Sequence, residues 1–351
     1  MCTPKSPSVL QSFTTHICRN KGGVLTSQFA KKTSPLFNPK LKFGLKLCFN
    51  LVSLPLHPMF KSAFITIIGL PNAGKSTFLN AALGEDLVIT NPKAQTTRHR
   101  IKGILNGEGY QLIFSDTPGI IEESAYRLQE AMMGAVNESL EDADAVLLIL
   151  DGQYPKIEQF EAYKNRIKCP LVVVMNKVDL VADQEKLQAD IAKVQEYLGT
   201  EHVYAASALE TFNIDGIIKT LVELAPEHPA FYDTDSISDE NVRFLVSEMI
   251  REQILTQFKK EIPYSVEVNV TEYNEKEKLD EIYATINVER DSQKGILLGR
   301  GGSAIKNLGI ASRKRIEEFI KKKIFLSLTV KVKKDWRSDE QQLQRFGYLK
   351  K

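Results

Sequence analysis

Cysteine is scarce in this sequence, and the little it has lies mostly at one end. Three of the four cysteines fall within the first 48 residues, and only Cys169 lies beyond them. No spacing typical of a zinc site or of a disulfide framework is present, which excludes a disulfide-stapled domain and fits a reducing compartment. No apolar run reaches the roughly 20 residues that a membrane-spanning helix needs. With 351 residues, 43% apolar and 26% charged, the chain has the composition of an ordinary globular protein with room for two domains.

Acidic residues are absent from the first 60 positions, which carry eight Lys or Arg. Residues 291–351 are also basic, with sixteen Lys or Arg against six acids, yet the whole chain has a net charge of only +2. The middle of the chain is therefore strongly acidic. A basic C-terminal segment attached to an acidic body favours a polyanionic partner for that segment, and a solvated lysine-rich surface is the plain alternative.

The basic extension 1–60 allows two interpretations. It is rich in Ser and Thr and free of acids, as organelle transit peptides are, and it contains the interrupted apolar stretch LKLCFNLVSLPL at 45–56. The interpretation that we favour places the true start at Met59, because the first expected strand begins only a few residues later. The protein would then be cytoplasmic, with a peripheral contact at the inner face of the cell membrane as an option. A genuine targeting segment, with import into an organelle, is the alternative.

A phosphate-binding loop stands out at residues 69–76, GLPNAGKS, which matches G-x-x-x-x-G-K-[ST] at every fixed position. The apolar run AFITII precedes it and predicts a buried strand, and STFLNAAL follows it and predicts a helix. This strand–loop–helix order is the context that the motif requires, because loop and helix amides together cradle phosphate oxygens. Lys75 is expected to reach the β- and γ-phosphates and Ser76 to bind Mg²⁺. A chance glycine-rich turn is a poor alternative in this context.

Three further motifs follow expected strands and favour guanine over adenine. The strand YQLIFSD ends in Asp116-Thr117-Pro118-Gly119, where the carboxylate suits Mg²⁺ and the Gly119 amide suits the γ-phosphate. The strand LVVVM leads into Asn176-Lys177-Val178-Asp179, and Asp179 can accept two hydrogen bonds that only guanine offers. HVYAAS leads into Ser207-Ala208-Leu209, where a backbone amide can meet guanine O6. Ligands of open α/β sheets bind at this carboxyl edge, so we predict GTP.

The segment NPKAQTTRHR at 91–100 is expected to close over Mg²⁺ as a nucleotide-sensing switch, with Thr97 preferred to Thr96. Ile120 occupies the position where Ras-type GTPases carry the glutamine that orients water. An aliphatic side chain cannot polarise water, so unassisted turnover should be slow. Asn72 is a candidate ligand for a monovalent cation such as K⁺, and a residue that only stabilises the loop is an equal alternative.

The contacts expected from these motifs form three overlapping sets. The nucleotide is assigned to Gly69, Leu70, Pro71, Asn72, Ala73, Gly74, Lys75, Ser76 and Thr77, to Asp116, Thr117, Pro118, Gly119 and Ile120, to Asn176, Lys177, Val178 and Asp179, and to Ser207, Ala208 and Leu209. Catalysis is assigned to Asn72, Lys75, Thr97 and Gly119, and Mg²⁺ to Ser76, Thr97 and Asp116. Together with helices expected at 125–139, 157–167, 184–198 and 214–224, the strands predict a doubly wound α/β sheet over 61–224.

A second domain is expected at 242–351, after a linker rich in Pro, Ser and Asp at 225–241. Its periodicity predicts the order α-β-β-α-α-β, with Gly299-Arg300-Gly301-Gly302 between the last two helices. Small residues there let a nucleic-acid backbone approach closely. The nearby aliphatics Ile296, Leu298, Ile305 and Leu308 are expected to line a groove for unstacked bases, as in a KH module, although some must serve only the core. Lys306, Arg313, Lys314 and Arg315 are expected to contact phosphates.

Taken together, these motifs resemble the Era family of GTPases over about 61–351. The resemblance is carried by GLPNAGKS, KAQTTRHRI, DTPG, NKVD, PYSVEV, GRGGSAIKNLGI and DWRSDEQQLQRFGY. It implies a GTPase domain followed by a type II KH domain, and a monomer that binds small-subunit rRNA near its 3′ end and assists assembly of the small ribosomal subunit. Two features depart from the family pattern, namely the extension 1–60 and an arginine-glycine pair where a lysine usually precedes the last glycine of the turn.

A membrane-surface regulatory GTPase is the alternative of a different class. In that case the basic region would meet anionic lipid and the KH fold would bind a protein. Sequence-dependent RNA affinity distinguishes the two, because lipid recruitment needs no base readout. In either case we hypothesise that GTP orders the segment around Thr97 and the loop after Gly119, and that the acidic body masks the basic groove in the GDP state.

Overall fold

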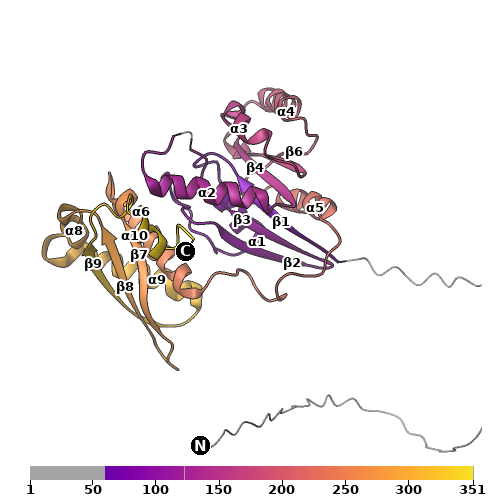
Figure 1. Cartoon of the computed structure of the whole chain (residues 1–351). Helices are drawn as coiled ribbons and strands as arrows, with labels where there is room; N and C mark the ends of the chain where they lie inside the picture. The colour runs from indigo at the N-terminus through magenta and orange to yellow at the C-terminus, as the bar shows by residue number, and fades with distance from the viewer. Residues whose placement is uncertain (1–59, 122, 351) are drawn as a thin grey trace, which may run out of the picture. The chain divides into compact units, whose positions relative to one another are not determined.

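The computed structural model describes residues 60–121 and 123–350. The interpretations of residues 1–59 therefore lie outside the described residues. Figure 1 shows the first domain (β1 to α5) and the second domain (α6 to α10), with most of their elements labelled. Elements of the first domain are β1 Lys61–Ile68, α1 Lys75–Leu83, β2 Ile101–Gly107, β3 Tyr110–Asp116, α2 Arg127–Glu141, β4 Ala145–Asp151, η1 Ile157–Phe160, α3 Glu161–Lys164, β5 Leu171–Asn176, η2 Val178–Leu180, α4 Gln184–Leu198, β6 Val203–Ala205 and α5 Ile214–Leu224.

The first domain is built on a six-stranded sheet in the order β2-β3-β1-β4-β5-β6. Every neighbouring pair from β3 to β6 is parallel, and only β2 runs antiparallel to its neighbour β3. The predicted doubly wound α/β fold is confirmed. Because β1, β3, β5 and β6 are parallel, the loops that follow them emerge at one edge of the sheet, which is where ligands of such folds bind.

Each face of this sheet has its own apolar core. On one face, Phe78 and Leu79 of α1 and Leu221 of α5 pack with inward residues of β1 such as Ile65. On the other face, α2 and α4 cover β4, and Val136 belongs to this second cluster. Strands buried on both faces read as continuous apolar runs, and β4, AVLLILD, is buried at six of its seven positions.

The second domain follows the predicted α-β-β-α-α-β order, with two short α-helices and one 3₁₀ turn added. Its elements are α6 Val242–Gln257, α7 Ile262–Ser265, β7 Glu267–Asn274, β8 Asp280–Val288, α8 Asp291–Leu298, η3 Arg300–Gly302, α9 Ser303–Ile320, β9 Ile324–Val332 and α10 Glu340–Arg345. In the sheet β7-β8-β9, β7 is antiparallel and β9 parallel to the central β8. The three glycines that join α8 to α9 all have positive φ, between 59° and 80°, which is the backbone region that glycine tolerates best.

The segment 225–241 has no helix or longer strand, but it is not a free linker. The Ser62 amide donates to the carbonyl of Pro226 at 3.2 Å, and the Ile104 amide donates to the carbonyl of Ile237 at 2.9 Å. Gln111 Oε1 accepts from the amides of Phe231 and Tyr232 at 2.8 and 3.0 Å. The backbone of this segment is therefore bonded to strands β1, β2 and β3 at several points.

Candidate functional site

Loops from the carboxyl edge of the first sheet enclose a pocket of about 430 Å³, within the usual range for ligand sites. It is lined by Pro71, Asn72, Gly74, Lys75, Ser76, Thr77, Thr90, Asn91, Pro92, Lys93, Gln95, Thr96, Thr97, Gly119, Lys177 and Leu209. Residues from the phosphate-binding loop, the 91–100 segment and three later motifs are thus brought together. The sequence predicted that the segment 91–100 as a whole lies at the nucleotide. It did not indicate which of residues 90–96 line the pocket, because their polar side chains form no motif of their own.

The phosphate-binding loop passes directly into α1, which begins at Lys75. Gly74 has a φ of +97°, and a Cβ at this position would lie 2.1 Å from Asn176 Nδ2. Only glycine fits there, and the exposed amides of the helix N-terminus favour an anion. Lys75 Nζ donates to the carbonyls of Gly69 and Leu70 at 3.2 and 3.0 Å. Burial lowers the pKa of Lys75 to about 8, and the Asp116 carboxylate opposes this shift.

Three oxygen-bearing side chains converge beside this lysine. Ser76 Oγ donates to Asp116 Oδ2 at 2.7 Å and lies 2.9 Å from Thr97 Oγ1. Thr97 Oγ1 also donates to Asp116 Oδ2, at 3.2 Å. Asp116 Oδ1 is buried without a hydrogen-bond partner among the described residues. A buried carboxylate oxygen without a partner, next to two hydroxyls, is a donor set that suits a small hard cation such as Mg²⁺.

The magnesium ion, when bound here, would neutralise charge on the phosphates. Asp116 and Ser76 would hold it from the rigid strand and helix, and Thr97 would reach it from the 91–100 segment. Burial raises the pKa of Asp116, while the Lys75 ammonium lowers it. Lys75 would contribute the fixed positive charge at the same end of the pocket.

The far end of the pocket is organised by Asn176, which does not itself line it. Its Nδ2 donates to the carbonyl of Ala73 at 2.8 Å, and its Oδ1 accepts from the amide of Ala208 at 2.9 Å. Lys177 Nζ pairs with Asp151 Oδ2 at 2.8 Å, and Lys177 lines the pocket as expected. Asp179 is exposed at the start of η2 and available for a base edge.

Ile120 lies outside the pocket. Only 3% of its surface is exposed, and it packs in the apolar cluster with Val136 and Leu148. Its amide donates to the carbonyl of Gly69 at 3.0 Å. The side chain that replaces a water-orienting glutamine is therefore part of the core. The neighbouring Gly119 does face the pocket, and a Cβ at this position would lie 2.8 Å from Pro71 Cα.

Several other predicted nucleotide contacts do not line this pocket. They are Gly69, Leu70, Ala73, Asp116, Thr117, Pro118, Val178, Ser207 and Ala208. Thr117, for example, is buried and donates through Oγ1 to the carbonyl of Ile67 at 2.7 Å. Asn72 lines the pocket at an exposed loop tip with a φ of +65°.

The second domain carries an open groove of about 610 Å³ between α9 and β9. It is lined by Leu279, Ile305, Lys306, Gly309, Ile310, Arg313, Ile324, Phe325, Leu326, Ser327 and Leu328. Ile310 is 53% exposed and Phe325 is 47% exposed, so these apolar side chains face solvent in the groove. Sequence reasoning missed both, because an aliphatic at helical spacing and an aromatic in a strand look like core residues.

The expected groove aliphatics divide between two roles. Ile305 lines the groove, whereas Leu308 is fully buried and belongs to the core. Ile296 is 49% exposed on α8, and Leu298 packs partly against the core. Gly299 is tightly placed, since a Cβ there would lie 2.6 Å from the Cβ of Ala304.

Arg300 of the glycine turn and the predicted phosphate contacts Lys306, Arg313 and Lys314 are exposed, as a phosphate-binding surface requires. Arg315 is not. Its Nε pairs with Glu252 Oε2 at 3.3 Å, and its Nη2 donates to the carbonyl of Asp86 in the first domain at 3.1 Å. The expectation that Arg315 contacts phosphate is wrong, because its guanidinium is used between the domains.

Comparison with known proteins agrees with this division. A family described as "50S ribosome-binding GTPase" matches residues 64–177, and a family described as "KH domain" matches residues 261–337. GTPase ERA1, chloroplastic, of Zea mays is 39% identical over 313 residues, which are 88% of this chain and 73% of the relative.

Two solved structures extend the similarity to the arrangement of the fold. One is Era in complex with MgGDPNP and nucleotides 1506–1542 of 16S ribosomal RNA, and the other is Aquifex aeolicus Era Y63A bound to GDP.AlF4⁻. Each is 33% identical to this chain with a TM-score of 0.78, and the match covers 82% of this chain and 99% of the solved one.

The fold and the site define a GTPase joined to a KH domain. The chain belongs to the Era family of GTPases, and its reaction is the hydrolysis of GTP to GDP and phosphate, with Mg²⁺ as the metal. In the part of the chain that the structure describes, no helix is both long and apolar enough to cross a membrane.

Proposed function

We propose that this GTPase binds single-stranded RNA at the 3′ end of the small-subunit rRNA and so assists assembly of the small ribosomal subunit. The observation that carries the proposal is the groove between α9 and β9, which combines exposed apolar side chains with exposed cations beside a glycine turn. The related Era structure that holds nucleotides 1506–1542 of 16S ribosomal RNA supports this choice of RNA.

The groove suits unstacked bases better than a lipid surface. Ile310 and Phe325 offer apolar and aromatic faces on which bases can pack. Lys306 and Arg313 line the same groove and supply positive charge for phosphates. Gly301 and Gly302 have no atom within 4 Å of an added Cβ, so the turn is open to an approaching backbone. We assign the RNA contacts to Gly299, Arg300, Gly301, Gly302, Lys306, Arg313 and Lys314.

The experiment is a titration of the full chain with a fluorescent RNA that carries the small-subunit 3′ end. Gly301→Asp/Gly302→Asp should abolish binding by placing carboxylates against phosphates, while GTP binding stays intact. Gly109→Asp/Gly199→Asp is the matched control, because both positions have positive φ and no atom within 4 Å of an added Cβ. Wild-type affinity in the double-turn variant would contradict the proposal, as would equal binding of RNAs of unrelated sequence.

We also propose that K⁺ assists hydrolysis through Asn72. The support is the position of Asn72, which lines the pocket at the tip of the phosphate-binding loop. A monovalent cation there would add positive charge beside the phosphates. The aliphatic Ile120, which stands where Ras-type GTPases carry a glutamine, gives no such help to hydrolysis. Hydrolysis should be faster in potassium than in sodium, and Asn72→Ala should remove the difference. Equal rates of the wild type in both salts would leave Asn72 as a loop residue only.

For the compartment, we propose import into an organelle, directed by the basic extension, in preference to a start at Met59. The support is the acid-free composition of residues 1–60 and the chloroplastic relative from Zea mays, whose match covers more of this chain than residues 60–351 alone supply. The mature N-terminus of the endogenous protein tests this. A protein cleaved within the extension at a position other than Met59, or just after the extension, supports import, and a protein that starts with an unprocessed Met59 contradicts it.

A further inference from the structure

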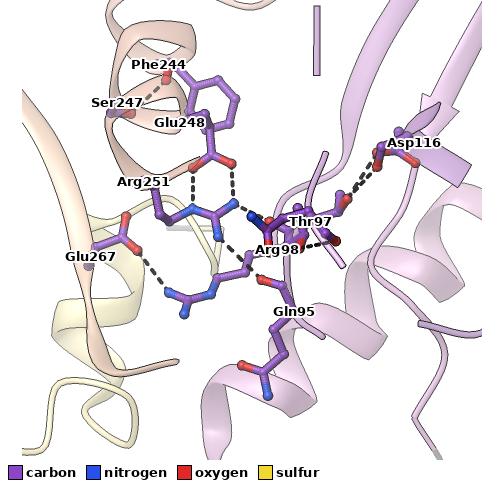
Figure 2. A network of polar contacts seen from close by, with 12 residues as sticks. Gln95, Thr97, Arg98, Asp116, Phe244, Ser247, Glu248, Arg251 and Glu267 are labelled. Carbon is purple, nitrogen blue, oxygen red and sulfur yellow. Dashed lines mark hydrogen bonds and ion pairs between the residues drawn. The ribbon is translucent and has the colours of Figure 1, made fainter. Parts of the chain in front are cut away.

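We propose that Arg251, on the first helix of the second domain, is a positioning residue for the GTPase site in the first domain. It holds the backbone on the N-terminal side of Thr97 and thereby fixes the hydroxyl that completes the oxygen cluster with Ser76 and Asp116. Figure 2 shows Arg251 between Glu248 of its own helix and the chain around Gln95 and Thr97.

Thr97 needs such support because its segment has no regular structure. No helix or strand lies between the end of α1 at Leu83 and the start of β2 at Ile101. Gln95 adds strain, since its φ of +58° is unfavourable for a residue with a side chain. The position of the Thr97 hydroxyl must therefore be fixed by side chains from elsewhere.

Arg251 supplies that support directly. Its Nη1 donates to the carbonyl of Gln95 at 3.3 Å, and its Nη2 donates to the carbonyl of Thr96. These are the two residues immediately before Thr97. The side chain of Gln95 is held as well, because Tyr126 Oη donates to its Oε1 at 3.1 Å, just before α2 begins.

The guanidinium is itself locked in place. Only 1% of Arg251 is exposed, and its Nε and Nη2 contact Glu248 Oε1 and Oε2 at 2.8 and 2.5 Å. A two-point arginine–carboxylate pair of this kind has one strongly preferred geometry. The remaining donors are thus aimed at the switch backbone from a rigid helix.

Two other side chains make contacts between the domains in the opposite direction, from the first domain to the second. Arg98 reaches into the second domain and donates to the carbonyls of Val266 and Pro263 at 2.7 and 3.0 Å. Lys93 Nζ donates to the carbonyl of Phe258 at 2.7 Å. These first-domain side chains anchor the second domain. Arg251, by contrast, is a second-domain side chain that holds the backbone beside Thr97.

Ordinary domain adhesion is the competing explanation, and the chain offers a control for it. Arg315 also donates from the second domain to a first-domain carbonyl, that of Asp86 at 3.1 Å, but it makes no hydrogen bond to Gln95, Thr96 or Thr97. Removal of Arg251 alone would leave Glu248 buried and unpaired, which destabilises folds. The main variant is therefore Glu248→Gln/Arg251→Met, which removes both charges and nearly keeps the volume. Arg251→Lys keeps the charge and is the second variant.

The experiment compares the full-length wild type with these variants and with Arg315→Ala. Affinities for a fluorescent non-hydrolysable GTP analogue and for fluorescent GDP are measured together with the Mg²⁺ dependence of hydrolysis. Because switch contacts to the γ-phosphate and its metal are absent in the GDP state, the Glu248→Gln/Arg251→Met variant should lose about tenfold or more in analogue affinity with GDP affinity unchanged. It should also need a correspondingly higher Mg²⁺ concentration for half-maximal rate.

Arg251→Lys should recover part of this loss, and Arg315→Ala should match the wild type in every measurement. Amide hydrogen exchange of residues 93–99 in the analogue-bound state provides a readout independent of turnover, and should be faster in the Glu248→Gln/Arg251→Met variant. Two outcomes would overturn the proposal. One is an unchanged ratio of analogue to GDP affinity in that variant. The other is a loss in Arg315→Ala equal to that in the double variant, which would show general adhesion of the domains.

Discussion

Asn176 and Ala73 are joined by a buried hydrogen bond, from the side-chain Nδ2 at the end of β5 to a carbonyl of the phosphate-binding loop at 2.8 Å. The same side chain accepts from the amide of Ala208 at 2.9 Å. One amide group therefore connects the loop for the phosphates with the loop for the base. The geometry explains why an asparagine opens the NKVD motif even though it does not line the pocket.

Replacing Asn176 with Asp should weaken GTP and GDP alike. A carboxylate cannot donate to the Ala73 carbonyl and would repel it, and loss of a buried hydrogen bond with an unpaired partner costs about 1–3 kcal/mol, or roughly 5- to 150-fold in affinity. Calorimetric titration with both nucleotides measures this. Asn106→Ala is the control, since Asn106 also donates to a distant carbonyl, that of Ser236 at 3.1 Å. A loss confined to GTP would show that Asn176 acts on the γ-phosphate and not on the whole loop.

Asp179→Asn should change the base that the protein prefers. Asp179 is exposed at η2, next to Lys177, whose Nζ is held by Asp151 at 2.8 Å. A carboxylate accepts from the N1–H and amine of guanine, whereas an amide can donate to the 2-oxo group of xanthine. Competition between GTP and xanthosine triphosphate is the measurement. A variant that binds GTP as tightly as the wild type would show that Asp179 does not read the base.

Ile120→Ala should affect stability more than catalysis. The side chain is 3% exposed in the cluster with Val136, and such truncations cost about 2–5 kcal/mol. The wild-type rate without partners should be on the order of 10⁻⁴–10⁻² s⁻¹, the range of unassisted Ras-type enzymes. Urea unfolding and single-turnover hydrolysis of the same preparation measure the two effects. A thousandfold slower rate with unchanged stability would reveal a direct catalytic role.

The fold was largely predictable from sequence, because its strongest signals are local. The boundaries of α4 and α5 coincide with the predicted 184–198 and 214–224, since apolar period, caps and flanking motifs agree there. The expected helix at 157–167 is instead a 3₁₀ turn followed by one short helix that ends at Lys164. Its apolar pattern is too weak to sustain a longer helix.

Contacts between distant segments were not predictable. Nothing in the polar sequence of 225–241 indicates that Gln111 accepts hydrogen bonds from two backbone amides of this segment. Arg251 sits within an amphipathic pattern where an arginine normally faces water, yet it is buried against Glu248 and the switch. The spacing of apolar residues indicates which face of a helix is buried. It cannot indicate a buried ion pair whose arginine also donates to carbonyls in another domain.

His99 should make stability depend on pH. It is stacked on Tyr348 at a ring-centroid distance of 4.1 Å and meets the edge of Phe244 at 5.2 Å. Burial lowers the pKa of His99 from 6.5 to about 4, with Glu248 opposing and Arg251 and Arg98 adding to the shift. The unfolded chain then binds more protons than the folded one between these values, so the His99 contribution is lost as pH falls from about 6.5 to 4.

His99→Phe keeps the stacked ring and removes the titration. The wild type should therefore lose up to about 3 kcal/mol relative to this variant as pH falls through that window. Urea unfolding of both proteins at several pH values between about 4.5 and 7.5 measures the difference, and the subtraction removes the other titrating groups. Parallel stability profiles would contradict a half-buried, neutral His99.

We expect the nucleotide site and the RNA groove to act together through the segment around Thr97. In this structure the acidic body does not mask the groove, because Ile310 and Phe325 are about half exposed. Arg251 of the second domain does contact the carbonyls of Gln95 and Thr96, immediately before Thr97. The most direct measurement is the affinity of the full chain for the small-subunit 3′-end RNA, with a non-hydrolysable GTP analogue and with GDP. We predict tighter binding with the analogue, by about 5- to 150-fold, and an equal gain in analogue affinity when RNA is bound. Identical RNA affinity in both nucleotide states would contradict this coupling and leave two independent modules on one chain.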